Sequence, residues 1–370
     1  MSPAEAELTV RLASTARARS AARARVGDLL RQVDSSAYTA RLAERGLLAL
    51  LGSRAIELAP EAADGLLRSR VEALLMEGRL RALALEMTLK RVAQALEDRG
   101  IPVLPLKGTT FADRVYGDTG LRPTTDVDVL VPRERVGAAL GALAAIGYPA
   151  PEDPVWTDGL PEMHYTLRGD DAGRARVELH WRVHWADRGF SEELLRAAPM
   201  AGDGFRRAEP AHELALLVLV LARDGLHGPR LAADVAAWWD RMGEGLAPGA
   251  LDGIAARHPS LRRSLVAGLA YAERSLGVPA RGLISGGAPD RSARLALALA
   301  DPLLLDERAD AFAKIMLVDA LLSTGRDKAG FLRRYVLQPL PYVRATRGLE
   351  DAPAAAVAGR AALHAAGTVV

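Results

Sequence analysis

The sequence predicts an α+β fold in which a small mixed β-sheet is flanked by helical regions on both sides along the chain. Residues 1–98 and 201–345 repeat apolar side chains at helical spacing, which indicates helices. Between them, residues 99–200 contain short Val-rich runs of alternating polarity, which are typical of strands. The 370 residues are 49% hydrophobic and 25% charged, an ordinary globular composition for a chain that can hold two or three domains.

The helical N-terminal region, residues 1–98, ends in the longest predicted helix. The run from Leu66 to Asp98 contains no proline, and Gly78 is its only glycine. Gly100 and Pro102 then break the helical pattern.

The central region, residues 99–200, is predicted to form the sheet and to carry the functional site. The expected strands are Val103–Leu106, Asp126–Val131, Tyr165–Arg168 and Arg176–His184. Two helices are expected between the first three strands, over Thr110–Tyr116 and Arg133–Ile146. The last two strands are expected to form a hairpin, because residues 169–173 read Gly-Asp-Asp-Ala-Gly and favour a turn.

After Gly204 the helical pattern returns, and residues 201–345 are predicted to form a C-terminal domain that is the second wall of a cleft. Its helices are expected to begin near Pro210 and to continue through Arg230–Met242, Ala250–Ala256, Leu261–Leu276, Arg291–Ala300 and Ala309–Leu322. Residues 346–370 form an Ala- and Gly-rich tail, whose stretch from Ala352 to Val370 is expected to be partly disordered.

The strand Asp126–Val131 carries two carboxylates separated by one apolar residue. Because strand side chains alternate between faces, Asp126 and Asp128 are expected on one side, and Val127, Val129 and Val131 in the core. Arg176–His184 alternates in the same way, with Val177, Leu179, Trp181 and Val183 on one face and Glu178 on the other. If the two strands are neighbours, Glu178 joins the aspartates. Three oxygen ligands suit Mg²⁺, which takes its other ligands from water and substrate phosphates, so the pattern implies a nucleoside triphosphate.

Lys107, Gly108 and Thr109 stand at a predicted strand-to-helix turn. Glycine lets the backbone approach a phosphate, the helix start offers free N–H groups, and Lys107 adds a positive charge. The alternative for Lys107 is an exposed lysine at a strand end. Arg122 could contact phosphate or hold its loop by pairing with an aspartate, and the sequence does not decide between these roles.

Other polar side chains allow a structural interpretation beside a functional one. His180 could line the site or hydrogen-bond within the sheet, and His184 would share its face if the strand continued, which makes a histidine metal pair conceivable. Arg230 and Asp234 stand four apart on a predicted helix and are expected to form a surface ion pair. Of the adjacent Trp238 and Trp239, one is expected in the core.

Composition excludes several classes of protein. The 48 basic and 46 acidic residues give a net charge of +2 without a basic block, and aromatic residues are only 5%, so a polynucleotide acceptor is not favoured. The absence of cysteine excludes disulfides and thiolate metal sites, and favours a reducing compartment, the cytoplasm. No apolar run is long enough to span a membrane. The Arg-rich stretch from Arg11 to Arg31 loosely mimics an organellar transit peptide, but Glu5 and Glu7 favour a solvated helix.

The residues of the predicted site, taken together, resemble those of the uncharacterised nucleotidyltransferases within the DNA-polymerase-β-like superfamily. The resemblance rests on the segments "LPLKGTTFADRVYGDTGLRPTTDVDVLV", "GYPA" and "VELHW", and extends more weakly from about residue 40 to about residue 290. It departs from the wider superfamily in having Gly108-Thr109 instead of Gly-Ser, and in a longer gap before Asp126. It also suggests an aspartate of the family's helical domain near Asp234, in contact with nucleotide or core.

What the resemblance implies is a nucleotidyltransferase core that transfers a nucleoside monophosphate from a nucleotide to an acceptor. Asp126 and Asp128 would bridge two Mg²⁺ ions, and Glu178 would complete the site or act as general base. ATP is the default donor, and the acceptor is a hydroxyl of either a small molecule or a protein or peptide. The competing hypothesis is a nucleotide-binding or interaction protein that keeps the fold without the chemistry.

Overall fold

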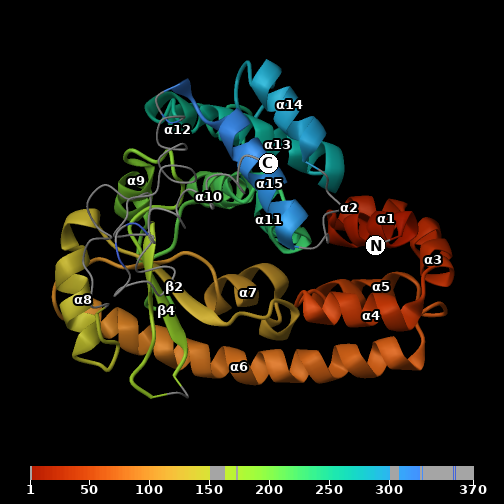
Figure 1. Ribbon diagram of the computed structural model, residues 1–370, viewed down its shortest axis with the longest axis horizontal. Helices are drawn as coiled ribbons and strands as arrows, with labels where there is room; N and C mark the ends of the chain where they lie inside the picture. Colours follow the sequence, from red (N-terminus) through yellow and green to blue (C-terminus); the bar gives the residue numbers. More distant parts are fainter. Residues whose placement is uncertain are drawn as a thin grey trace.

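The computed structural model describes residues 2–150, 163–171, 174–300, 308–325 and 327, with two isolated positions at 353 and 355. It confirms the α+β fold: one small sheet lies among helices that precede and follow it in the chain (Figure 1). Among the described helices, none combines the length and the apolar character that crossing a bilayer requires. The predicted tail, residues 346–370, lies outside the described residues apart from positions 353 and 355.

The N-terminal region is helical, as predicted. Its elements are α1 (Pro3–Ala13), α2 (Ala16–Ala21), α3 (Arg23–Gln32), α4 (Ser35–Glu44), a π-helical turn (Leu48–Gly52), α5 (Ser53–Leu58) and α6 (Gly65–Glu97). Helix α6 has 33 residues and begins where the Asp64 carboxylate accepts a hydrogen bond from the Leu67 N–H. In Figure 1 it runs along one edge of the molecule, beneath α4, α7 and the sheet.

Gly78 lies within α6 and does not break the helix. A side chain at Gly78 would place its Cβ 3.0 Å from the Cα of Gly120, in the 3₁₀ turn Thr119–Leu121. The glycine therefore allows two backbones to touch. This contact holds the loop that precedes the site against the long helix.

The sheet has four strands in the order β1-β2-β4-β3. These are β1 (Leu104–Pro105), β2 (Asp126–Leu130), β3 (His164–Leu167) and β4 (Arg176–His180). The outer pairs are antiparallel, which confirms the pairing of the predicted hairpin, while β2 and β4 run parallel. Of the predicted turn, positions 172 and 173 lie outside the described residues.

One face of the sheet is buried under α6 and α8 (Val136–Ala144), and the prediction for its side chains is largely confirmed. The members from β2 and β4 and the residues just after them are Val127, Val129, Val131, Val177, Leu179 and Trp181. Val183 was expected with them and is not there, because β4 ends at His180 and the chain turns away. Val183 instead belongs to the larger cluster that the helical regions form.

Several predicted boundaries also change. Helix α7 (Thr109–Tyr116) agrees to one residue, whereas β1 is only two residues long. The helix predicted over Arg133–Ile146 begins with the 3₁₀ turn Arg133–Arg135, and α8 follows it. Strand β3 starts at His164, one residue earlier than expected.

The C-terminal region is helical, as predicted, and its helices share one core with the N-terminal region. They are α9 (Phe190–Ala197), which was not predicted, α10 (Pro210–Arg223), α11 (Pro229–Met242), α12 (Asp252–Arg257), α13 (Arg262–Leu276), α14 (Arg291–Leu299) and α15 (Arg308–Leu322). Helix α1 packs against α11 and α13. Residues of both regions therefore form one hydrophobic cluster, and the division into domains stays a prediction.

Candidate active site at the sheet

The parallel pairing of β2 with β4 brings the predicted carboxylates together. Asp128 lies directly beside Glu178 in the register, and Asp126 lies two residues earlier on the same face. The Asp128 side chain is fully buried, whereas those of Asp126 and Glu178 are 18% and 20% exposed. The three carboxylates thus lie on the face opposite the valine core, with one enclosed and two open to the surface.

Lys107 reaches this group from the other side of β2. Strand β1 pairs antiparallel with β2, and the Leu106 N–H donates to the carbonyl oxygen of Asp128 at 3.1 Å. Lys107, the next residue in the chain, places its Nζ 3.2 Å from Asp128 Oδ1. Lys107 keeps 34% of its side chain exposed. Lys107 is therefore a partly exposed cation next to a buried carboxylate.

Gly108 makes the predicted strand-to-helix turn. Its φ of 92° and ψ of −145° are backbone angles that residues with a Cβ rarely adopt. Helix α7 begins at Thr109, and no side chain caps its first turn. The N–H groups at this helix start are thus available to an anion, one residue from Lys107.

Two histidines complete the group, and only one of them was considered from the sequence. His180 Nε2 lies between two carboxylates, 3.1 Å from Asp128 Oδ1 and 3.3 Å from Glu178 Oε2. His164, on β3, faces it with a ring-centroid distance of 4.6 Å. His164, Glu178 and His180 hold ligand atoms within 4.8 Å of one another. The alternation His164-Tyr165-Thr166-Leu167 could have indicated this, since Tyr165 and Leu167 are the core residues of β3.

The protonation of the group follows from burial and charge. Burial opposes ionisation of Asp128, but the charge of Lys107 and the hydrogen bond from His180 outweigh it and hold its pKa below the ordinary value. The pKa of Asp126 is raised by burial and by the negative charges of Asp128 and Glu178. Burial, followed by the positive charge of His180, lowers the pKa of His164 to about 4. A cation bound beside Asp126 would therefore favour its ionised form.

A divalent metal fits these residues. Asp128 Oδ2 is buried and accepts no hydrogen bond from the described residues. This oxygen therefore has lone pairs available to bind a metal ion. Carboxylate oxygens are the ligands that Mg²⁺ prefers, and the imidazoles nearby also suit softer divalent ions.

Arg122 takes the structural alternative that the sequence left open. Its guanidinium binds Asp234 of α11 through Nε at 2.9 Å and Nη2 at 2.9 Å, and its Nη1 donates to Thr124. Arg122 and Asp234 are 6% and 1% exposed. The Tyr116 hydroxyl donates a further hydrogen bond to Asp234. This network holds the loop before β2, and it leaves Arg122 no free face at the surface.

Two expectations for neighbouring residues are wrong. Asp234 does not form a surface pair with Arg230, because it is buried against Arg122, and Arg230 donates to the carbonyl oxygens of Arg45 and Gly46. His184 does not share a strand face with His180, since β4 has already ended, and its Nδ1 accepts from the Ala186 N–H.

Other expectations hold or gain an addition. Trp238 is fully buried, so one of the two tryptophans is in the core as expected. Arg223, in the last turn of α10, was not expected at the site. The charges of Asp128 and Glu178 contribute to raising its pKa against the effect of burial, after the larger contribution of Asp224. Arg176, at the start of β4, also places Nη2 3.7 Å from Asp126 Oδ2, so Arg223 is a further cation near the carboxylates beside Lys107 and Arg176, and no sequence motif marked it.

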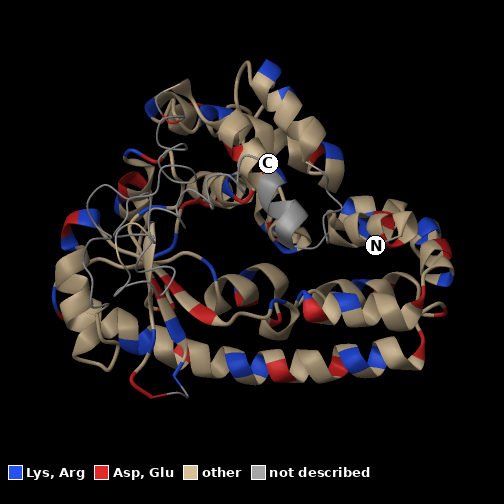
Figure 2. Ribbon diagram, viewed as in Figure 1, with Lys and Arg blue, Asp and Glu red and all other residues tan. Residues whose placement is uncertain are grey.

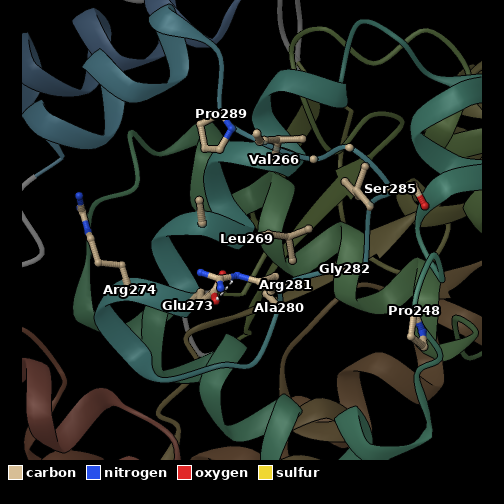
Figure 3. A pocket seen from close by; sticks show the side chains of 15 residues that line it. Pro248, Val266, Leu269, Glu273, Arg274, Ala280, Arg281, Gly282, Ser285 and Pro289 are labelled. Carbon is tan, nitrogen blue, oxygen red and sulfur yellow. Dashed lines mark ion pairs between the residues drawn. The ribbon is translucent and has the colours of Figure 1, made fainter.

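A separate hollow of about 990 Å³ lies in the C-terminal helical region (Figure 3). It is lined by α13 and the loop after it, and it holds one ion pair, between Arg281 and Glu273 at 3.3 Å. None of the predicted site residues lines this hollow. The candidate site is therefore the face of the sheet that carries Asp126, Asp128 and Glu178.

Comparison with known proteins gives one result. Residues 31–277 match a family described as uncharacterised nucleotidyltransferase, and the match includes the whole sheet and helices α4 to α13. No curated protein and no solved structure matches the chain.

Proposed function

Because the chain belongs to the family of uncharacterised nucleotidyltransferases, we propose that it transfers a nucleoside monophosphate from a nucleoside triphosphate to an acceptor hydroxyl, in a metal-dependent reaction. Membership makes the protein a phosphorus-transferring enzyme, and a nucleotide substrate follows from it. Metal dependence, the residues of the site and the acceptor are the parts that we propose.

One observation carries the proposal: the register that places Asp128 beside Glu178, with Lys107 3.2 Å from the same aspartate. Strands that are distant in sequence bring three carboxylates and a cation to one point. A buried carboxylate with an unpartnered oxygen is costly unless something binds it, which supports a metal ligand at Asp128.

The triphosphate would lie against Lys107, Gly108 and Thr109. The open first turn of α7 supplies backbone N–H groups, and the exposed third of Lys107 supplies a charge for phosphate oxygens. Arg122 would contribute indirectly, since its pairing with Asp234 fixes the loop that leads into β2. Arg223 would add positive potential at the carboxylates.

Asp126, Asp128 and Glu178 would hold Mg²⁺, which when bound supplies charge neutralisation for the leaving pyrophosphate and a lowered pKa for the acceptor hydroxyl. Glu178 would take the acceptor's proton if it does not bind metal, because its carboxylate is 20% exposed. His180 holds Asp128 and Glu178 through one nitrogen and would orient both. The acceptor is a small molecule or a protein or peptide side chain.

The test is calorimetric titration of each of the four nucleoside triphosphates, with Mg²⁺ and with chelator, into the wild type and Asp128→Asn. We expect one nucleotide to bind only with metal, and to bind Asp128→Asn at least about tenfold more weakly. Asp28→Asn is the matched control, because Asp28 is an exposed carboxylate on α3. Equal binding by wild type and Asp128→Asn would refute the assignment of Asp128.

Turnover is tested separately, by pyrophosphate release with candidate acceptor hydroxyls. Asp126→Asn and Asp128→Asn should abolish it while the far-ultraviolet circular dichroism stays that of the wild type. Near-normal turnover in either variant would refute the mechanism. Metal-dependent binding of a nucleotide without any pyrophosphate release would favour the non-catalytic alternative.

A further inference from the structure

Helix α6 carries an apolar stripe that no described part of the chain covers. Five of the eight large hydrophobic side chains that are exposed among the described residues lie on this one helix: Leu66, Met76, Leu80, Leu83 and Met87. The last four are 55%, 62%, 61% and 68% exposed. Single exposed apolar residues are normal on a protein surface, but a contiguous row marks a contact surface.

The spacing of the row is that of a coiled-coil seam. Met76, Leu80, Leu83 and Met87 are separated by four, three and four residues, so they lie in one line along the helix. The opposite side of the same stretch is anchored in the molecule by buried Ala82, Leu85 and Leu89. In Figure 1, α6 runs along the lower edge of the molecule, and in this view the sheet strands cross it near its C-terminal end.

We propose that α6 packs in antiparallel fashion against α6 of a second copy of this chain, which makes the protein a homodimer. A two-fold axis between Leu80 and Leu83 would set Leu80 opposite the partner's Leu83, and Met76 opposite the partner's Met87. The stripe is therefore complementary to its own reverse, as a two-fold interface requires.

The charges beside the stripe support this partner and this direction. Glu72, Arg79 and Glu86 border one flank of the seam, and Lys90 stands where the apolar row ends. Figure 2 shows acidic and basic residues alternating along α6. When the partner helix runs in the opposite direction, Glu72 lies near the partner's Lys90 and Arg79 near the partner's Glu86. Each of these four residues then lies near an opposite charge. In a parallel pair, Glu72 would lie near the partner's Glu77, which is unfavourable, and Glu86 near the partner's Arg91, which is favourable, so the two contacts offset each other and the antiparallel pair gains more.

The flanking residues have partners on their own chain that differ in strength. Lys90 pairs with Glu86 at the exposed surface, where their side chains are 61% and 43% exposed, so giving up that pair costs little. Arg79 is 50% exposed and binds Asp118 through both Nε and Nη2, so it would keep that pair and add a contact to the partner. The stripe from Met76 to Met87 is about 16 Å long at about 1.5 Å per residue, a small seam, so the dimer should be weak and concentration-dependent.

The experiment is sedimentation equilibrium of the full chain over a range of concentrations. The wild type should show a monomer–dimer equilibrium, and the double variant Leu80→Gln, Leu83→Gln should weaken association at least about tenfold, through lost apolar burial. Leu295→Gln is the matched control, because Leu295 is 51% exposed on helix α14. A wild type that stays monomeric overturns the proposal, as does a dimer that the Leu80 and Leu83 changes leave intact.

A charge exchange tests the direction without touching the stripe. Glu72→Lys alone would set a lysine against the partner's Lys90, and Lys90→Glu alone would set two acidic residues together, so each should weaken the dimer. The double variant, Glu72→Lys with Lys90→Glu, should restore the wild-type dissociation constant. Failure of the double variant to recover, with wild-type circular dichroism, overturns the antiparallel arrangement.

Discussion

Arg122 and Asp234 form a buried two-point ion pair that joins the loop before β2 to helix α11, 112 residues later in the chain. A surface carboxylate would contribute little in such a pair. Here both partners are desolvated, so each charge depends on the other. The position of β2, and with it the candidate site, therefore depends on a helix of the C-terminal region.

Changing Asp234 to Ala should lower the free energy of unfolding by about 3 to 5 kcal/mol, because it leaves the Arg122 charge buried without its partner. Urea unfolding measures this. Glu77→Ala is the control, since Glu77 pairs with Arg81 at the exposed surface and its loss should cost less than about 1 kcal/mol. Similar losses in the two variants would contradict the role of the buried pair.

Gly120→Ala should destabilise the protein by about 1 to 3 kcal/mol, because its Cβ would lie 2.5 Å from the Leu75 carbonyl oxygen and must move α6 or the 3₁₀ turn. Gly141→Ala is the opposite case. Nothing lies within 4 Å of its Cβ, and it is inside helix α8, so alanine should stabilise by up to about 1 kcal/mol. Thermal unfolding of both variants measures these changes in stability. A Gly120→Ala protein as stable as the wild type would contradict the close approach of Gly120 to the Leu75 carbonyl oxygen.

Gly108→Ala should weaken both folding and nucleotide binding. Its Cβ has room, with Thr124 at 3.9 Å, but a φ of 92° strains any residue with a side chain by about 1 to 3 kcal/mol. Relief of that strain would turn the first N–H groups of α7 away from the phosphates. Calorimetry with the nucleotide that binds the wild type measures the loss. Unchanged affinity would show that the Gly108 turn does not form the phosphate contact.

Glu193 should make stability depend on pH in the acidic range. The Arg257 side chain, followed by His212 and His258 against the opposing effect of burial, holds its pKa well below the ordinary value. A carboxylate with a lowered folded-state pKa stabilises the fold above its unfolded pKa, and loses this contribution as pH falls through the folded pKa. The difference in unfolding free energy between wild type and Glu193→Gln should therefore be largest near neutral pH and shrink in acid. A difference that grows in acid would contradict this.

Local patterns in the sequence determined the fold class, most helices and the faces of the strands. Alternation in β2 correctly separated Asp126 and Asp128 from Val127 and Val129, because side-chain direction in a strand depends only on the backbone of neighbouring residues. The chemical types at Lys107, Gly108 and Glu178 likewise indicate phosphate and metal through their sequence context alone. They remain predictions of function, although the fold brings them together.

Only the tertiary structure decided which distant residues meet. No local pattern shows that β4 lies parallel to β2, that His164 faces His180, or that Arg122 binds Asp234. These contacts depend on register and packing between segments that are far apart in sequence, and many partners are chemically equivalent until the core selects one. The end of β4 at His180, the core shared by both helical regions and the uncovered stripe of α6 follow from the same packing. Sequence periodicity sets which way a side chain points, and the packing of the whole chain sets what it meets.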